Sequence, residues 1–133
     1  SGLFDFQRAD AEGVRWVLAS DIGGGPYLSL LDVMASFVRQ NRASGVNAAS
    51  FVRALFRSTQ AGADVLGLGS RKGSFESGKD MDFIAIKAEA DQLKNDSAES
   101  VLEAVICPHE DTRENYESLI RKTVIEGETV FEC

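Results

Sequence analysis

An apolar run ends on a carboxylate, and three glycines and a proline follow at once. The run covers Val14 to Ala19, the carboxylate is Asp21, and Gly23 to Gly25 precede Pro26. A nearly continuous apolar run is typical of a strand buried on both faces, as in a parallel sheet. Glycine lets the backbone turn sharply, and proline suits the first turn of a helix. The segment therefore predicts a strand, a tight turn and a helix, which is the repeating unit of an α/β fold.

Asp21 lies where the predicted strand ends. In an eight-stranded α/β barrel, catalytic residues lie at the C-terminal ends of the strands. A carboxylate in that place can bind a metal ion or move a proton. The chain has a single histidine, His109, which is far from Asp21 in the sequence. A zinc site built on Asp21 would need ligands that this chain lacks, so we interpret the chain as part of an enzyme.

Size and charge narrow the class of protein. The chain has 133 residues, the size of one ordinary domain, and a net charge of −7. This charge argues against broad contact with nucleic acid or an anionic membrane, both of which require clustered Lys and Arg. No stretch approaches the roughly 20 apolar residues of a membrane span.

The N-terminus, Ser1 to Phe4, shows no signal-peptide pattern and no Met, which predicts a processed, tagged or excised chain.

The two cysteines, Cys107 and Cys133, lack the spacing of a zinc or redox motif. We expect two reduced thiols in the cytosol, with Cys107 serving in packing.

The spacing of apolar residues predicts the other elements. Helices are expected over residues 5–12, 26–40, 48–61 and 97–106, polar loops over 41–45, 89–96 and 108–115, and strands over 14–19, 83–86, 121–125 and 129–131. Ser29 and Asp32 offer a start similar to a capping box, and Asn47 is the expected N-cap of the third helix. The last two strands flank Glu126 to Glu128, which predicts a hairpin with glycine in its turn.

Several polar residues have a plain structural interpretation. Arg53 and Arg57 are four residues apart, as expected of the solvated face of a helix. Lys79 and Asp82 are expected to stabilise the hairpin or the boundary of the strand that follows them. His109 lies in a polar loop and is expected to be solvated rather than a ligand.

The residues alone leave the role of Asp21 open. Without further context, an aspartate in this place is more often a helix cap or a turn residue. Three glycines before a helix can also cradle a phosphate through backbone N–H groups. The Gly-Lys-Ser/Thr ending of a phosphate-binding loop is missing, however, which argues against that alternative.

Residues 66–86 carry the most specific motif of the chain. They read LGLGSRKGSFESGKDMDFIAI. This segment resembles a signature of the amidohydrolase superfamily, in which Leu-Gly ends a helix and Gly-Ser, an apolar residue, Glu, Gly-Lys and Ala-Asp follow. Met81 stands where the signature commonly has Ala.

The earlier part of the chain resembles the guanine-deaminase branch of this superfamily. That branch has Gly-Thr-Asp or Ala-Ser-Asp before a glycine-rich turn and a Ser-Leu-Leu helix start, as at Ala19 to Asp21 and Ser29 to Leu31 here. The resemblance covers Ser1 to Phe131 and implies an α/β plus β fold. It implies the C-terminal portion of a TIM-type (β/α)8 barrel, with its last strand and closing helices, over residues 1–68. Strands of a small β-sandwich domain with a helical insertion are expected over residues 69–133.

The resemblance also implies what Asp21 does. In the family, the aspartate of the last barrel strand ligates zinc and takes a proton from the metal-bound water. Asp21 is thus the expected catalytic and metal-binding residue, and Gly23 and Gly24 match the turn beside it. The implied cofactor is one zinc ion per intact chain, and the implied reaction turns guanine into xanthine and ammonia.

The histidine ligands and most contacts to the purine would lie outside this sequence, so its substrate-binding residues are unassigned. The family further implies a cytoplasmic enzyme of purine catabolism that forms a homodimer. Two alternatives stay open: a related enzyme that acts on another amino- or chloro-heterocycle, and a non-catalytic fragment or assembly half. An unpaired strand and an apolar helix would be exposed in the isolated chain. We therefore expect that chain to be inactive, and to be oligomeric or bound to its missing part.

Overall fold

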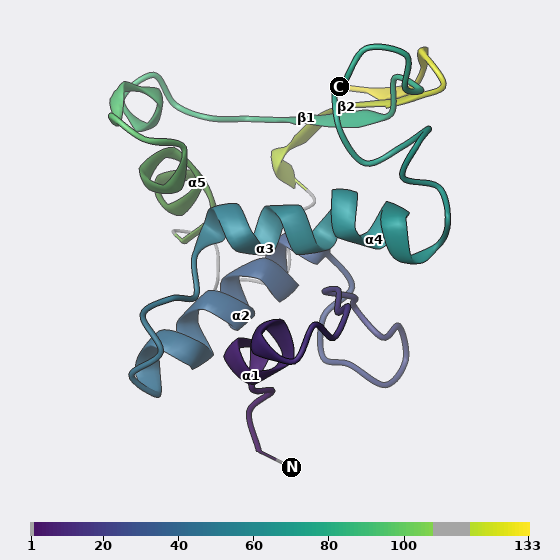
Figure 1. Ribbon diagram of the computed structural model, residues 1–133. Helices are drawn as coiled ribbons and strands as arrows, with labels where there is room; N and C mark the ends of the chain where they lie inside the picture. Colours follow the sequence, from purple (N-terminus) through teal and green to yellow (C-terminus); the bar gives the residue numbers. More distant parts are fainter. Residues whose placement is uncertain (1, 108–117) are drawn as a thin grey trace.

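The computed structural model describes residues 2–107 and 118–133. It consists of packed helices with a small antiparallel sheet next to them. The elements are α1 (Phe6–Ala11), α2 (Leu30–Ala43), α3 (Phe51–Ser58), α4 (Gln60–Val65), β1 (Phe83–Ile86), the 3-10 turn η1 (Gln92–Lys94), α5 (Ala98–Ile106), β2 (Ile120–Ile125) and β3 (Glu128–Glu132). Helices α1 to α4 form the lower and middle part of Figure 1, the sheet lies above them, and α5 lies to one side. No helix of the described part is long and apolar enough to cross a membrane. His109 and the loop expected over 108–115 lie outside the described residues.

Side-chain caps set where the longer helices begin. Ser29 caps α2, as expected, and its hydroxyl accepts a hydrogen bond from the N–H of Leu31. The third helix begins later than predicted, because Ser50 and not Asn47 is its N-cap. The expected helix over 48–61 is also two helices, since Thr59 leaves the helical conformation with φ −125° and ψ −90°.

Helix α2 lies about four residues further along the chain than predicted. It starts after the Ser29 cap rather than at Pro26, and it continues through Asn41 into the segment expected to be a loop. The Asn41 side chain is buried, and its amide donates to the carbonyl oxygen of Phe37 at 2.8 Å. A polar residue that is satisfied within the helix does not end it.

The strand expected over 14–19 is absent from the described residues. None of β1 to β3 is paired with this segment, and a strand forms only against a neighbour that completes its hydrogen bonds. Burial is also uneven, because Trp16 is buried whereas Val14 is 51% exposed. The segment is instead attached to α3, where the N–H of Leu18 donates to the carbonyl oxygen of Arg57 at 3.1 Å.

The core consists of two clusters that Leu18 and Phe37 join. The first contains Met34, Ala35, Val38, Phe51, Ala54, Ile106 and Leu119, and the second contains Phe6, Ala9, Trp16 and Ala49. Aromatic rings dominate the second cluster, where Phe6, Trp16 and Phe37 lie with ring centroids 5.2–5.8 Å apart. Cys107 packs against the first cluster, and no disulfide joins it to Cys133.

The sheet has the order β1-β2-β3 and is antiparallel throughout. Strand β1 has the predicted bounds, and the predicted hairpin of β2 and β3 is confirmed. Its turn contains Glu126 at φ 51° and Gly127 at φ 82°, which is the left-handed pair that a tight hairpin requires.

Asp82 fastens this turn to the start of β1. Its carboxylate accepts hydrogen bonds from the N–H of Glu126 at 2.7 Å and from the ammonium of Lys72. The Glu126 N–H, and after it Lys72, lowers the pKa of Asp82, while the hydrogen bond to Asp82 is the main cause that raises the pKa of Lys72. The role predicted for Asp82 is confirmed. Lys79 differs from its prediction, because its ammonium contacts Glu76 and the side chain of Gln60 on α4.

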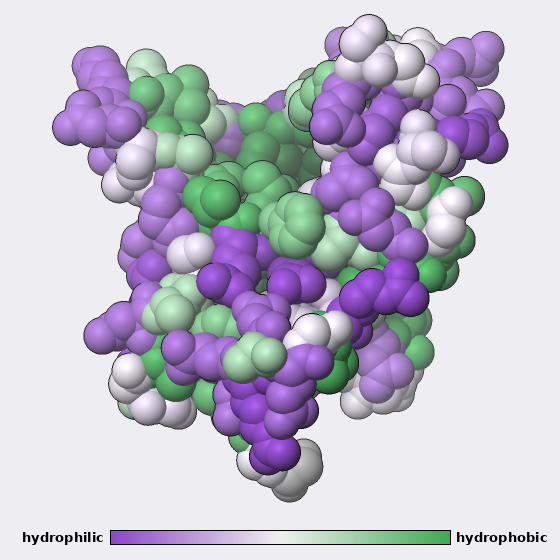
Figure 2. All heavy atoms as spheres, viewed as in Figure 1, coloured by the Kyte–Doolittle hydropathy of each residue, from purple (hydrophilic) through white to green (hydrophobic). Residues whose placement is uncertain are grey.

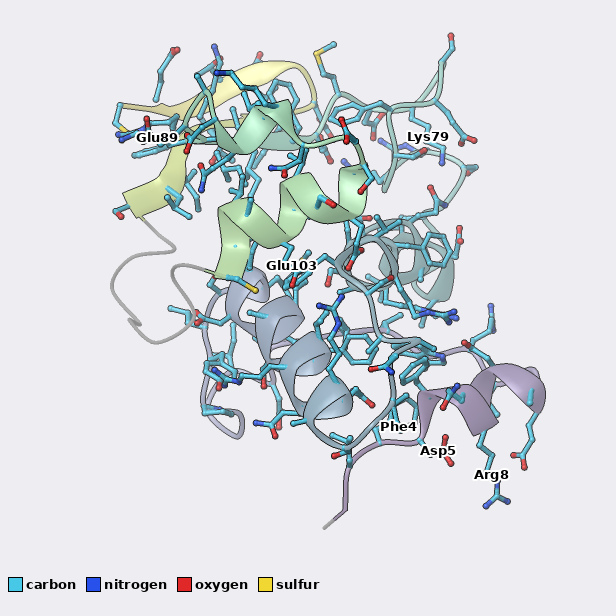
Figure 3. The ribbon with its side chains drawn as sticks, turned by 90° about the vertical axis from the view of Figure 1, so that its left-hand side faces the viewer. Phe4, Asp5, Arg8, Lys79, Glu89 and Glu103 are labelled. Carbon is cyan, nitrogen blue, oxygen red and sulfur yellow. The ribbon has the colours of Figure 1, made fainter. Side chains whose placement is uncertain are left out.

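Glu99 attaches α5 to the helical layer. Its carboxylate accepts from the guanidinium of Arg42 and from the N–H groups of Phe51 and Val52 at the start of α3, all at 2.8–2.9 Å. Glu103 follows one turn later and also pairs with Arg42; Figure 3 shows it between α5 and the helices beneath. One carboxylate thus caps a helix and bridges two others.

Replacing Glu99 with Ala should lower the free energy of unfolding by about 1–2 kcal/mol, the usual cost of a lost N-cap. Glu12→Ala is the matched control, because Glu12 also pairs with an arginine but does so on the exposed surface of α1. Urea unfolding followed by circular dichroism measures both variants. Equal losses in the two variants would contradict the capping role.

Stability should depend on pH through Asp82. Its pKa is lower in the folded chain than the ordinary 3.8, so its contribution is present above that value and is lost as the pH falls through the folded-state pKa. Asp82→Asn should therefore lower the urea midpoint at pH 7, and the difference from wild type should shrink below about pH 3.8. A difference that stays constant with pH would refute the role of the carboxylate charge.

Candidate functional site

Asp21 occupies a backbone conformation that few residues adopt. Its φ is 48°, and Glu126 is the other non-glycine residue of the described ranges with a positive φ. The Asp21 carbonyl oxygen accepts from the N–H groups of Gly24 at 2.8 Å and Gly25 at 2.6 Å, which closes a tight turn. Such conformations cost about 1–3 kcal/mol each and gather at functional sites. The turn therefore holds Asp21 in a restricted conformation beside the glycines, which is compatible with a functional role.

Backbone conformation restricts Gly23, a backbone contact restricts Gly25, and a side chain at Gly24 would displace the Asp21 carboxylate. A Cβ atom at Gly24 would lie 2.5 Å from Asp21 Oδ2, and one at Gly25 would lie 2.3 Å from the carbonyl oxygen of Ser20. Gly23 has a φ of 93°, which L side chains rarely adopt. The turn predicted at Gly23 and Gly24 is confirmed.

The phosphate-cradle alternative for this turn is wrong. Its N–H groups at Gly24 and Gly25 already donate to the Asp21 carbonyl oxygen. Helix α2 begins only at Leu30, so the glycines do not form a helix N-terminus, and Pro26 does not lie in a first helical turn.

Asp21 lines a cavity of about 320 Å³ and is exposed to solvent. The other lining residues are Leu3, Phe4, Leu18, Ala19, Ser20, Gly25, Pro26, Tyr27, Val33, Ser36, Phe37, Gln40 and Asn41. They come from the N-terminal segment, the Asp21 turn and one face of α2. Phe4, labelled in Figure 3, lies next to the start of α1 and places its ring edge-on to Trp16. The carboxylate is thus next to a hollow with a mainly apolar wall.

The described residues do not form a complete metal site around Asp21. Asp21 offers carboxylate oxygens, which suit zinc. A catalytic zinc ion needs three protein ligands, and no group of three His, Cys, Asp or Glu side chains comes together within residues 2–107 and 118–133. Further ligands for a metal at Asp21 would have to come from outside this part of the chain.

Arg53 and Arg57 are not the solvated pair that their spacing suggests. Both guanidinium groups bind the carboxylate of Asp10 on α1, and that of Arg57 also lies 4.1 Å from the ring centroid of Trp16. Arg57 and Asp10 thereby reach Trp16, which lies in the segment that leads to Asp21. No spacing in the sequence signals them, because Asp10 lies 43 residues from Arg53.

Comparison with known proteins places the chain in a family. The profile of the Amidohydrolase family matches residues 1–130. A "Probable guanine deaminase" of Deinococcus radiodurans is 38% identical over 92 residues, which are 68% of this chain and 21% of that protein.

Two solved structures agree with this assignment. The guanine deaminase of E. coli superposes with a TM-score of 0.81 and 25% identity over 99% of this chain and 31% of its own. The guanine deaminase of C. acetobutylicum, solved with guanine bound in its active site, gives a TM-score of 0.71 and 25% identity over 98% of this chain and 30% of its own. The chain spans about a third of the length of these structures. It belongs to the amidohydrolase family.

Proposed function

We propose that this chain is the C-terminal part of a zinc-dependent hydrolase that deaminates guanine to xanthine and ammonia. Three relatives that bear the name guanine deaminase support the substrate. The strained Asp21 turn beside a cavity is the observation that carries the proposal. As the resemblance of the sequence to this family implies, we further propose that the intact protein is a cytoplasmic enzyme of purine catabolism and acts as a homodimer.

Asp21 is the residue of this chain that would hold the metal. When bound, a zinc ion lowers the pKa of its water from about 15.7 to about 7 and so supplies a nucleophile at neutral pH. A carboxylate has two oxygens, so that Asp21 can bind the ion through one and accept a proton at the other. Its short side chain and the closed turn hold these oxygens in one place. The remaining ligands and the contacts to the purine would come from polypeptide outside these 133 residues.

The unpaired segment 14–19 fits this arrangement. We assign it to the last strand of a (β/α)8 barrel, with residues 1–68 as the end of the barrel and residues 69–133 as strands of a small β-sandwich domain. Asp21 would then lie at the C-terminal end of a barrel strand, where active sites of this fold are built. The missing neighbour strands would come from the rest of the protein.

An apolar groove lies between α3 and the sheet, and it supports the proposal that this chain is one part of a larger protein. Two adjoining cavities of about 400 and 380 Å³ share Leu55, Thr59 and Ile84. Along α3, Phe51 is buried, whereas Val52, Leu55 and Phe56 are 39–47% exposed. Figure 2 shows hydrophobic surface gathered in the hollow above α3, between α5 and the sheet.

The rest of the same polypeptide is the occupant that we assign to this groove. The chain covers only 21–31% of its relatives' lengths, so a far larger part of the protein is available to cover it. Exposed apolar patches of this kind are rare on finished monomers and mark contact sites.

The reaction is tested with the full-length protein and Asp21→Asn. Asparagine has the same size and tolerates a positive φ, so the change removes the charge and keeps the turn. The kcat/KM for guanine should fall at least ~100-fold, because an acid–base group is worth about 10²–10⁴. Asp5→Asn is the control, because Asp5 is an exposed N-cap and asparagine also caps.

Ammonia release and zinc content are measured on both variants and the wild type. Wild-type turnover of another amino- or chloro-heterocycle instead of guanine would favour the related-enzyme alternative. Unchanged zinc content and turnover in Asp21→Asn would remove Asp21 from the site.

The groove assignment predicts that residues 1–133 alone will self-associate, because their apolar surface lacks its cover. Size exclusion with light scattering should show oligomers, and adding the separately expressed remainder of the protein should replace them with a one-to-one complex. A monodisperse monomer of residues 1–133 would contradict the assignment. Oligomers that persist beside the remainder would point to a second copy as the occupant.

A further inference from the structure

We propose that Arg57 is a positioning residue that clamps the segment leading to Asp21. The clamp consists of Arg57 on α3, Asp10 on α1, and Trp16 and Leu18 between them. The conclusion that this clamp serves catalysis rests on the proposed function of Asp21. The contacts themselves are properties of this chain.

Arg57 holds the segment with both its backbone and its side chain. Its carbonyl oxygen accepts from the N–H of Leu18 at 3.1 Å. Its Nη1 donates to the carbonyl oxygen of Trp16 at 3.2 Å, and the guanidinium lies 4.1 Å from the centroid of the Trp16 ring. A planar guanidinium can stack on a ring and donate in its own plane at the same time, which an ammonium cannot do.

Asp10 fixes the guanidinium in this orientation. Its Oδ1 accepts from Arg57 Nη2 at 2.7 Å and from the indole Nε1 of Trp16 at 2.7 Å. The Arg57 side chain is only 17% exposed, so water competes weakly for these charge-assisted bonds. Arg8, on the same helix as Asp10, instead points away from the body of the molecule in Figure 3 and pairs with Glu12 on the surface.

The clamp is the firm support on the upstream side of Asp21. Only two residues separate Leu18 from Asp21, so chain connectivity keeps Asp21 within three Cα–Cα steps of about 3.8 Å of Leu18, whose N–H is held by Arg57. On the downstream side come three glycines, and the next helix begins only at Leu30. No strand of the described residues pairs with the segment. The place of the carboxylate therefore depends on where Arg57 holds Trp16 and Leu18.

Arg53 provides a matched control one helical turn away. It binds the other oxygen of Asp10 and lies over the ring of Phe6 at 5.2 Å. Within the described residues, its side chain makes no hydrogen bond, ion pair or ring interaction with Trp16 or Leu18. Its loss removes an ion pair to Asp10 and leaves the grip on the segment in place.

The test compares Arg57→Gln with Arg53→Gln in the full-length protein. Hydrogen exchange is first measured on the metal-free protein at the amides of Leu18, Gly24 and Gly25. Arg57→Gln should raise exchange at these amides at least ~10-fold relative to the amides of α1, whereas Arg53→Gln should leave that ratio unchanged. Zinc affinity should then fall about 10–100-fold in Arg57→Gln alone, the usual effect of losing a residue that orients a ligand.

A third variant separates positioning from folding. Arg57→Lys keeps the charge beside Asp10 but cannot hold Asp10 and Trp16 in one plane, so it should restore the thermal midpoint and still show raised exchange at Gly24 and Gly25. If Arg57→Gln does not fold, the exchange rates of Arg57→Lys decide whether Arg57 positions the segment. Exchange at the Asp21 turn that stays at the wild-type rate in the folded arginine variants, or that rises equally in Arg53→Gln, would overturn the clamp. Absence of zinc binding and guanine turnover in the wild type would instead overturn the proposed function, and the metal-free exchange data would still decide the clamp.

Discussion

The carboxylate of Asp10 is the interaction on which this arrangement depends. It accepts hydrogen bonds from Trp16, Arg53 and Arg57, and so joins the first helix, the third helix and the segment between them. Its three donors converge next to the aromatic cluster, where partial burial strengthens charged hydrogen bonds. The segment that carries Asp21 has no strand partner in the described residues, and this network takes the place of one.

The Asp21 turn has a restricted backbone beside a cavity. Asp21 and Gly23 have positive φ values, and a Cβ atom at Gly25 would meet the carbonyl oxygen of Ser20. Backbone outliers of this kind cluster at functional sites, which supports the proposed role of Asp21. The exposed groove along α3 and the unpaired segment before Asp21 have a common explanation in the rest of a longer amidohydrolase, since the chain spans about a third of the solved guanine deaminases.

Local chemistry explains which predictions succeeded. The Ser29 cap, the bounds of strand β1 and the hairpin at Glu126 depend on residues close in sequence or on turn geometry, and all agree with the structure. Asp82 also has its expected role at the hairpin, although its partner Glu126 lies 44 residues away. The errors have non-local causes. Ser50, and not Asn47, caps α3. Glu99 of α5 accepts a further hydrogen bond from the first N–H of that helix, at Phe51. The strand over 14–19 needed a neighbouring strand, and none of the strands within residues 2–107 and 118–133 pairs with it.

The sequence by itself determined the family, the Asp21 turn and the glycines around it, because these rest on residue types in fixed order within a short stretch. Only the tertiary structure decided what Arg53 and Arg57 do. Their spacing is that of a solvated helix face, and their partner Asp10 lies 43 and 47 residues away. A charged side chain pairs with whatever the fold brings beside it, and no local pattern encodes that neighbour.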